Sequence, residues 1–158
     1  MAKDPVALAG EKRELPKVEL KPVDETTPQF RNFHISNVYC NGAEKGIFVR
    51  GIPEMHVKDI VLENMVLQAD KGIDIQEASG ISLKNIKIIS KETNPVIDII
   101  QSDKLQFDNI SYSDGSELLF RISGDRSNGI RIKNTDATKA KQSIVYELGA
   151  TEKAVTRE

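Results

Sequence analysis

A six-residue phrase recurs five times along this chain of 158 residues: apolar, any, apolar, any, Asn, and then usually an apolar residue. Its copies are FHISNV (33–38), IVLENM (60–65), ISLKNI (81–86), LQFDNI (105–110) and IRIKNT (130–135). The asparagines follow one another at intervals of 27, 21, 24 and 25 residues: Asn37, Asn64, Asn85, Asn109 and Asn134. Repetition at this period is the sequence signature of a solenoid, in which each repeat stacks on the next.

The phrase predicts a strand that ends in a bend. Alternation of apolar and variable residues is typical of a strand with one buried face. The residues expected to point inward are Phe33, Ile35, Ile60, Leu62, Ile81, Leu83, Leu105, Phe107, Ile130 and Ile132. Asn tolerates the left-handed backbone conformation, which suits a bend at the same corner of every repeat. The stacked amides are also expected to hydrogen-bond to one another along the stack.

A second short strand follows each phrase. The segments are GIFVRG (46–51), GIDIQE (72–77), VIDIIQ (96–101), LLFRIS (118–123) and SIVYEL (143–148). In the first three, the residues expected to face inward are Ile47, Val49, Ile73, Ile75, Ile97 and Ile99, and those expected to face outward are Phe48, Arg50, Asp74, Gln76 and Asp98. Two short strands per repeat, with no long helical pattern between them, predict an all-β fold: a right-handed parallel β-helix of about five coils. The handedness comes from the general rule for crossover connections.

We expect the coils to occupy residues 30–150. Residues 1–29 contain four prolines and many charges, which predicts an extended arm or linker. Residues 151–158 (TEKAVTRE) predict a frayed polar tail. The first coil is apolar like the middle of a longer stack, whereas the last coil has Thr135, Asp136 and Thr138 where apolar residues are expected. An uncapped solenoid end exposes its core, so we expect self-association through the first coil.

Composition excludes several classes of function. The net charge is −2 and the charges are mixed, which argues against a nucleic-acid partner. No apolar run is long enough for a membrane span. Cys40 is the only cysteine, so no internal disulfide is expected, and the N-terminal stretch has no apolar core of signal-peptide length. His34 and His56 have no partners at ligand spacing, so we expect no metal or other cofactor.

The sequence resembles the C-terminal coils of family 28 glycoside hydrolases, the polygalacturonase-like enzymes. The resemblance rests on TPQF (27–30), HISNV (34–38), GIFVRGIPE (46–54), VLEN (61–64), KGIDIQEASGI (71–81) and NTDATK (134–139). It implies a right-handed parallel β-helix and a pectic polysaccharide or oligogalacturonide as ligand. It also implies a substrate cleft on the outer face of one sheet, hydrolysis with inversion, and a parent enzyme that is secreted or periplasmic.

The family's catalytic motifs are not matched. They comprise, in chain order, an NTD, a double Asp, a GHG and an RIK. Here the letters NTD (134–136) and RIK (131–133) overlap in reversed order within the repeated phrase, and the chain has neither a double Asp nor a GHG. We therefore interpret both matches as accidental and predict distal coils that have no turnover on their own. The alternative is a stand-alone carbohydrate-binding or assembly module without enzymatic activity.

Two groups of side chains are candidates for chemistry. Asp74 and Asp98 occupy equivalent outward positions on adjacent coils, with backbones about 4.8 Å apart, and are weak candidates for an acid/base pair. The alternative is that both are solvated charges, and the sequence indicates no Arg, Lys or His beside them. Arg50 could bind the carboxylate of an acidic sugar bidentately, with Phe48 as an apolar platform and Gln76 beside it. The alternative for Arg50 is a surface residue with an ion-pair partner such as Glu77.

Overall fold

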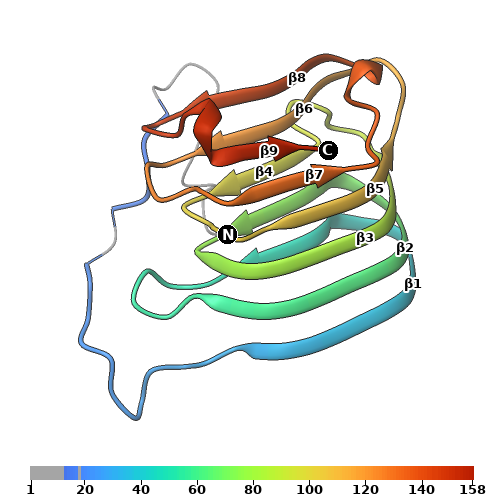
Figure 1. Cartoon of the computed structure of the whole chain (residues 1–158). Coiled ribbons are helices and arrows are strands. Elements are labelled where there is room, and N and C mark those ends of the chain that lie inside the picture. The colour runs from blue at the N-terminus through green and yellow to red at the C-terminus, as the bar shows by residue number, and fades with distance from the viewer. Residues whose placement is uncertain (1–12, 18) are drawn as a thin grey trace.

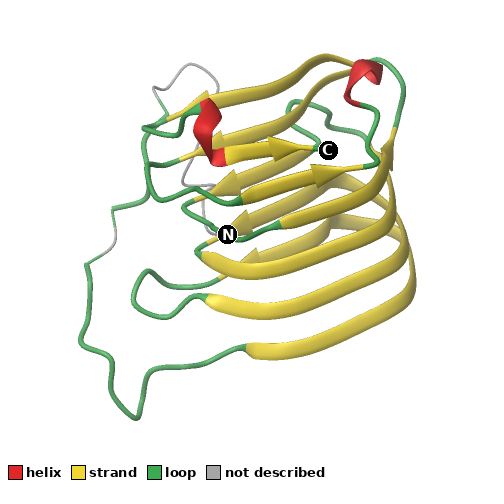
Figure 2. Cartoon of the chain, viewed as in Figure 1, coloured by secondary structure: helices red, strands yellow, loops and turns green. Residues whose placement is uncertain are grey.

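The chain winds into a right-handed parallel β-helix of about five coils (Figure 1). The structure is a computed structural model and describes residues 13–17 and 19–158. Its strands are β1 (Arg31–Arg50), β2 (Val57–Gln76), β3 (Ala78–Ser90), β4 (Ile97–Ile100), β5 (Gln106–Tyr112), β6 (Ser116–Ser123), β7 (Ile130–Lys133), β8 (Ala140–Glu147) and β9 (Val155–Arg157). Two short 3₁₀ turns, η1 (Ala137–Lys139) and η2 (Glu152–Ala154), lie near the C-terminus (Figure 2).

The strands stack into two parallel sheets that face each other across the core. The first sheet contains the first halves of β1 and β2 together with β3, β5, β7 and β9. The second sheet contains the second halves of β1 and β2 together with β4, β6 and β8. Stacking is in register, because the same apolar position of each phrase pairs from coil to coil: Ile35, Leu62, Leu83, Phe107 and Ile132. The predicted architecture is confirmed.

The first two coils differ from the prediction of two separate strands. β1 and β2 are each a single bent strand of 20 residues that contributes to both sheets. Their pairing shifts by one residue between Asn41 and Ala43, where an extra residue lets the backbone turn without leaving the ladder. The sequence pattern does not show this, because alternation is interrupted at the bend whether or not the hydrogen bonds continue.

The repeated asparagines form the predicted corner. All five have left-handed backbone conformations, with φ between 47° and 60°. The amide of Asn85 donates to Asn64 at 3.1 Å, and the amide of Asn109 donates to Asn85 at 2.9 Å. At the last corner Asn134 donates instead to Asp108 at 2.8 Å. The amide ladder is therefore confirmed for the three central coils and is replaced by a carboxylate contact at the last coil.

The aliphatic core lies between the sheets. Eight of the ten inward residues predicted from the phrase are less than 9% exposed, and Phe107 and Phe120 meet edge to face across the core at 5.1 Å. Phe33 and Ile35 are the exceptions, at 47% and 45% exposed. Their burial was predicted from the phrase and is wrong, because they belong to the terminal coil and no described residue covers them from below.

The C-terminal segment is ordered, so the prediction of a frayed tail over 151–158 is wrong. After η2, strand β9 pairs with β7 and begins a further turn of the helix. Ala154 is 5% exposed, and the carboxylate of Glu158 contacts Arg131 at 2.7 Å and Lys133 at 3.0 Å. These ion pairs lower the pKa of Glu158 below its ordinary value. The polar composition of the tail therefore reflects exposed strand positions rather than disorder.

The described part of the N-terminal arm runs past the second sheet without regular secondary structure, as predicted for an arm. Arg13 forms ion pairs with Glu147 in the fifth coil and with Asp98 in the third, the latter at 4.0 Å. Farther along the arm, the carbonyl of Phe30 accepts a hydrogen bond from the amide of Lys58. The arm thus spans the stack from its C-terminal end to its first coil (Figure 1). Residues 1–12, which the prediction also assigned to the arm, lie outside the described residues.

Candidate functional site

The outer face of the second sheet carries two columns of side chains in register. The first column contains Phe48, Asp74, Asp98, Arg121 and Val145, and the second contains Arg50, Gln76, Ile100, Ser123 and Glu147. All five candidate residues from the sequence therefore lie in adjacent columns of one face. Parallel stacking produces this arrangement, because equivalent positions of successive coils lie about 4.8 Å apart.

A cavity of about 490 Å³, here called the arm cavity, opens beside the second column. Its walls come from the arm, from the loop after β1 and from the corners after β2 and β4. They include Leu15, Pro16, Leu20, Arg50, Ile52, Pro53, Gln76, Glu77, Ile100, Gln101 and Arg126. The lining combines an apolar surface with two guanidinium groups, two amides and the carboxylate of Glu77, which is paired with Arg126. Such a lining suits a small ligand that has both a nonpolar face and a negative charge.

Arg50 is the cation of this cavity for which no partner is found among residues 13–17 and 19–158. Within the described residues its guanidinium forms no ion pair or hydrogen bond. The alternative from the sequence was a surface Arg with a partner such as Glu77. Glu77 is not that partner: its carboxylate contacts Arg126 at 2.8 Å and His56 at 3.1 Å instead. An exposed guanidinium beside a half-apolar cavity is available to a ligand carboxylate.

Gln76 lies closer to the interior than the sequence predicted. It was expected to face outward and does so by register, but it is only 6% exposed. The arm covers this part of the sheet, as the low exposure of the neighbouring outward residue Ile100 (2%) also shows. The Gln76 amide donates to Asp74 at 3.2 Å and so connects the two columns.

A smaller cavity of about 190 Å³, here called the aspartate cavity, lies beside the first column. Its polar lining consists of Lys71, Asp74, Glu92, Asn94, Asp98 and Arg121. The expectation that no cation lies near the two aspartates is therefore wrong. Arg121 donates to Asn94 at 3.1 Å and lies 3.9 Å from the carboxylate of Glu147.

The two aspartates are in register, and each lies near a cation. Asp74 accepts from Lys45 at 2.8 Å, and Asp98 lies 4.0 Å from Arg13. Their side chains are 16% and 23% exposed. Inverting hydrolysis requires one carboxyl group that keeps its proton and a second that activates water about 6.5–9.5 Å away. Both carboxylates already contact protein cations, and no distance between the two carboxyl groups identifies them as such a pair.

Phe48 does not line either cavity of the second sheet. Its ring lies under the ammonium of Lys45, which is 4.2 Å from the ring centroid. The same lysine binds Asp74, so Phe48 helps to hold the cation of the first column. Phe48 is 51% exposed and borders the open end of the first coil.

The sequence contained signals for the cations that the prediction missed. Lys45 and Lys71 occur in repeated Lys-Gly-Ile triplets, and their positions pair in register between β1 and β2. Arg121 stands between Phe120 and Ile122, the same outward position that Asp98 occupies in the preceding coil. Arg13 could not have been found, because its contact with Asp98 spans the arm and depends on the path of a segment without periodicity.

The NTD (134–136) and RIK (131–133) segments lie on the first sheet and its corner, where their side chains contact other residues of the last coil. The hydroxyl of Thr135 donates to the carbonyl of Lys133, and Asp136 caps η1 by accepting from the amide of Thr138 at 2.9 Å. The hydroxyl of Thr138, which also donates to Asp136, and then this amide lower the pKa of the Asp136 carboxyl group. Arg131 and Lys133 bind Glu158 as described above. These contacts stabilise the closing coil.

Comparisons with family models, curated proteins and solved structures found no match to this chain. Among the described residues, no three His, Cys, Asp or Glu side chains lie close enough together to hold a metal ion. The only helices in this part of the chain are the two 3₁₀ turns, and neither is long enough to cross a membrane.

Proposed function

We propose that this protein forms the distal, non-catalytic coils of a polygalacturonase-like β-helix and binds acidic oligosaccharide of the pectic type in its arm cavity. Arg50 binds a uronate carboxylate, and Ile52 and Pro53 contact the nonpolar face of a sugar ring. The chain alone has no hydrolytic activity in this proposal. The observation that carries it is the guanidinium of Arg50 at the edge of a half-apolar cavity, where no other described residue forms an ion pair or hydrogen bond with it.

The lining of the cavity supports this ligand class. A galacturonate ring has one nonpolar face, several hydroxyl groups and one carboxylate, which match the apolar, amide and cationic parts of the wall. Arg126 lies in the same wall but already binds Glu77 at 2.8 Å, so Arg50 is the cation available for the ligand. The aspartate cavity lies on the same sheet face, where hydroxyl groups of a neighbouring sugar could reach Asn94 and Arg121.

The resemblance of the sequence to family 28 glycoside hydrolases supplies the polysaccharide class. A parallel β-helix presents a long, flat sheet face, which suits an extended chain of sugars. The absence of the double Asp and GHG from the sequence is the reason for assigning binding without catalysis.

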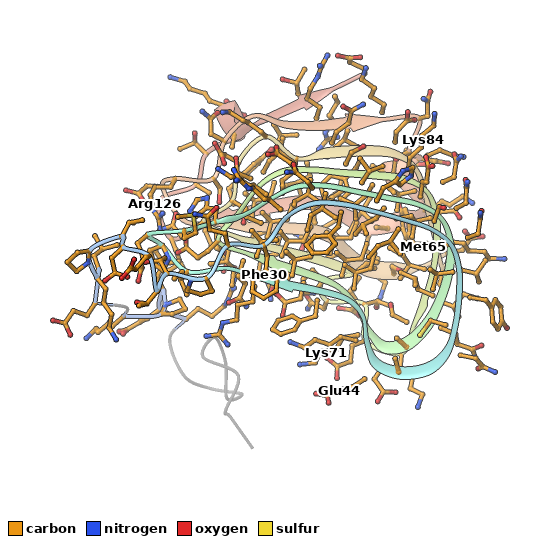
Figure 3. The ribbon with its side chains drawn as sticks, turned by 90° about the horizontal axis from the view of Figure 1, so that it is seen from below. Phe30, Glu44, Met65, Lys71, Lys84 and Arg126 are labelled. Atoms are coloured by element: carbon orange, nitrogen blue, oxygen red, sulfur yellow. The ribbon has the colours of Figure 1, made fainter. Side chains whose placement is uncertain are left out.

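Calorimetric titration with trigalacturonate tests this proposal. We expect saturable binding that Arg50→Gln weakens about tenfold or more, since a charge-assisted hydrogen bond contributes about 1.5–3 kcal/mol. Lys84→Gln is the control, because it removes one positive charge on the opposite side of the molecule from the arm (Figure 3). The unmodified chain should bind fully methyl-esterified trigalacturonate as weakly as the Arg50→Gln variant binds free trigalacturonate.

Three results would contradict the proposal. These are heat signals that do not saturate, equal affinity for the acid and its methyl ester, or an Arg50→Gln variant that binds like the unmodified chain. A reducing-end assay on polygalacturonate tests the non-catalytic part separately. Release of new reducing ends that Asp74→Asn abolishes would show that the first column is catalytic.

A further inference from the structure

The N-terminal arm forms one wall of the arm cavity. Leu15, Pro16 and Leu20 line this cavity together with residues of the second sheet and its corners. Two side chains of the same lining, Gln76 and Ile100, stand at outward positions of the sheet, and yet they are only 6% and 2% exposed. The arm is the segment that covers them. Without it, the cavity would be an open sheet face that has lost part of its apolar wall.

The arm is held near its two ends and hardly at all between them. At one end, Arg13 forms ion pairs with Glu147 and with Asp98. At the other end, the carbonyl of Phe30 accepts a hydrogen bond from the first sheet. Between these two points the described residues form no hydrogen bond or ion pair with the coils, and their own hydrogen bonds close a local turn at 24–27. A segment with so few contacts opens at a much lower free energy than the coils unfold.

We propose that the arm is a lid over the arm cavity and that Arg13 is the latch that holds it closed. The arm moves about the attachment at Phe30 (Figure 1). In the closed state Leu15 and Pro16 complete the wall, and in the open state Ile100 meets solvent and a ligand can enter. The identity of the ligand rests on the proposed function, whereas the movement itself needs no ligand. Because a ligand contacts the closed arm, ligand binding and closure strengthen each other by the same factor.

Thiol labelling of Ile100→Cys measures opening without any ligand. The variant is made in a Cys40→Ser chain, so that the reporter is the only cysteine. It should label more slowly than Ile89→Cys, because Ile89 is 38% exposed in β3 and lies outside the cavity lining. Arg13→Gln should speed labelling at position 100 about tenfold, the factor expected for the loss of one charge-assisted hydrogen bond. Arg131→Gln is the matched control, because it removes an Arg–Glu ion pair on the first sheet and should leave labelling unchanged.

Trigalacturonate then tests whether closure completes the site. Arg13 is not among the described residues that line the cavity, so its replacement acts on a ligand through the arm. In calorimetric titration Arg13→Gln should bind trigalacturonate more weakly than Arg131→Gln does, because only the closed fraction of the molecules presents the complete wall. Arg13→Lys keeps the positive charge and should recover part of the affinity together with part of the slow labelling.

Three outcomes would overturn the lid. These are labelling of Ile100→Cys as fast as that of Ile89→Cys, labelling that Arg13→Gln does not change, or faster labelling of Arg13→Gln with an unchanged affinity for trigalacturonate. Gln76→Cys is the second reporter if Ile100→Cys fails to fold, since Gln76 is also covered by the arm. If no variant binds trigalacturonate, the proposed function fails, and the labelling rates still decide whether the arm opens.

Discussion

Replacement of Asn85 by alanine tests whether the amide ladder stabilises the solenoid beyond its effect on the backbone. Asn85 donates to Asn64 at 3.1 Å and accepts from Asn109 at 2.9 Å. Each bond contributes about 0.5–1.5 kcal/mol. Because the amides are exposed and their partners can turn to water, we take the lower value, which gives about 1 kcal/mol for the pair. Asn85 has a left-handed backbone conformation with φ of 54°, and placing alanine in this conformation costs about a further 1–2 kcal/mol.

The expected loss for Asn85→Ala is therefore about 2–3 kcal/mol in the free energy of unfolding, measured by urea titration. The matched control is Asn37→Ala. Asn37 has the same residue type and a φ of 60°, but within the described residues its amide makes no ladder bond. This variant should lose only the conformational part, about 1–2 kcal/mol. If the two variants lose equal free energy, the ladder contributes nothing and the asparagines serve the bend alone.

Three further predictions concern a corner, the C-terminal segment and the arm. Gly51→Ala should destabilise the chain by about 2 kcal/mol or more in urea titration, because a Cβ there would lie 2.1 Å from the carbonyl oxygen of Glu77. Glu158 binds Arg131, and its pKa lies below the ordinary 4.5, so its contribution to stability is present above about pH 4.5 and is lost as pH falls through the folded-state pKa. When the pH is lowered from about 5 to about 3, the melting temperature of Glu158→Gln should therefore fall less than that of the unmodified chain. Arg13→Gln should release the arm from the second sheet and increase tryptic cleavage within residues 13–30 severalfold. A cleavage rate equal to that of the unmodified chain would contradict this prediction.

The candidate site could be predicted in part. The outward positions of Arg50, Asp74 and Asp98 follow from alternation and were confirmed by register. Arg121 could have been placed beside Asp98 by the same reasoning, one coil farther along. The burial of Gln76 could not, because it depends on a proline-rich arm whose sequence carries no period that would assign it to a face.

The sequence by itself determined the coil. An apolar phrase that ends in Asn every 21–27 residues specifies strands, corners and an inward face, because these features are local and repeat with the chain. The tertiary structure decided what lies against each coil. It left Phe33 exposed at the open end, ordered the tail through Glu158, and covered the second sheet with the arm. These outcomes depend on contacts between segments distant in sequence, and no local pattern encodes which surface such a segment meets.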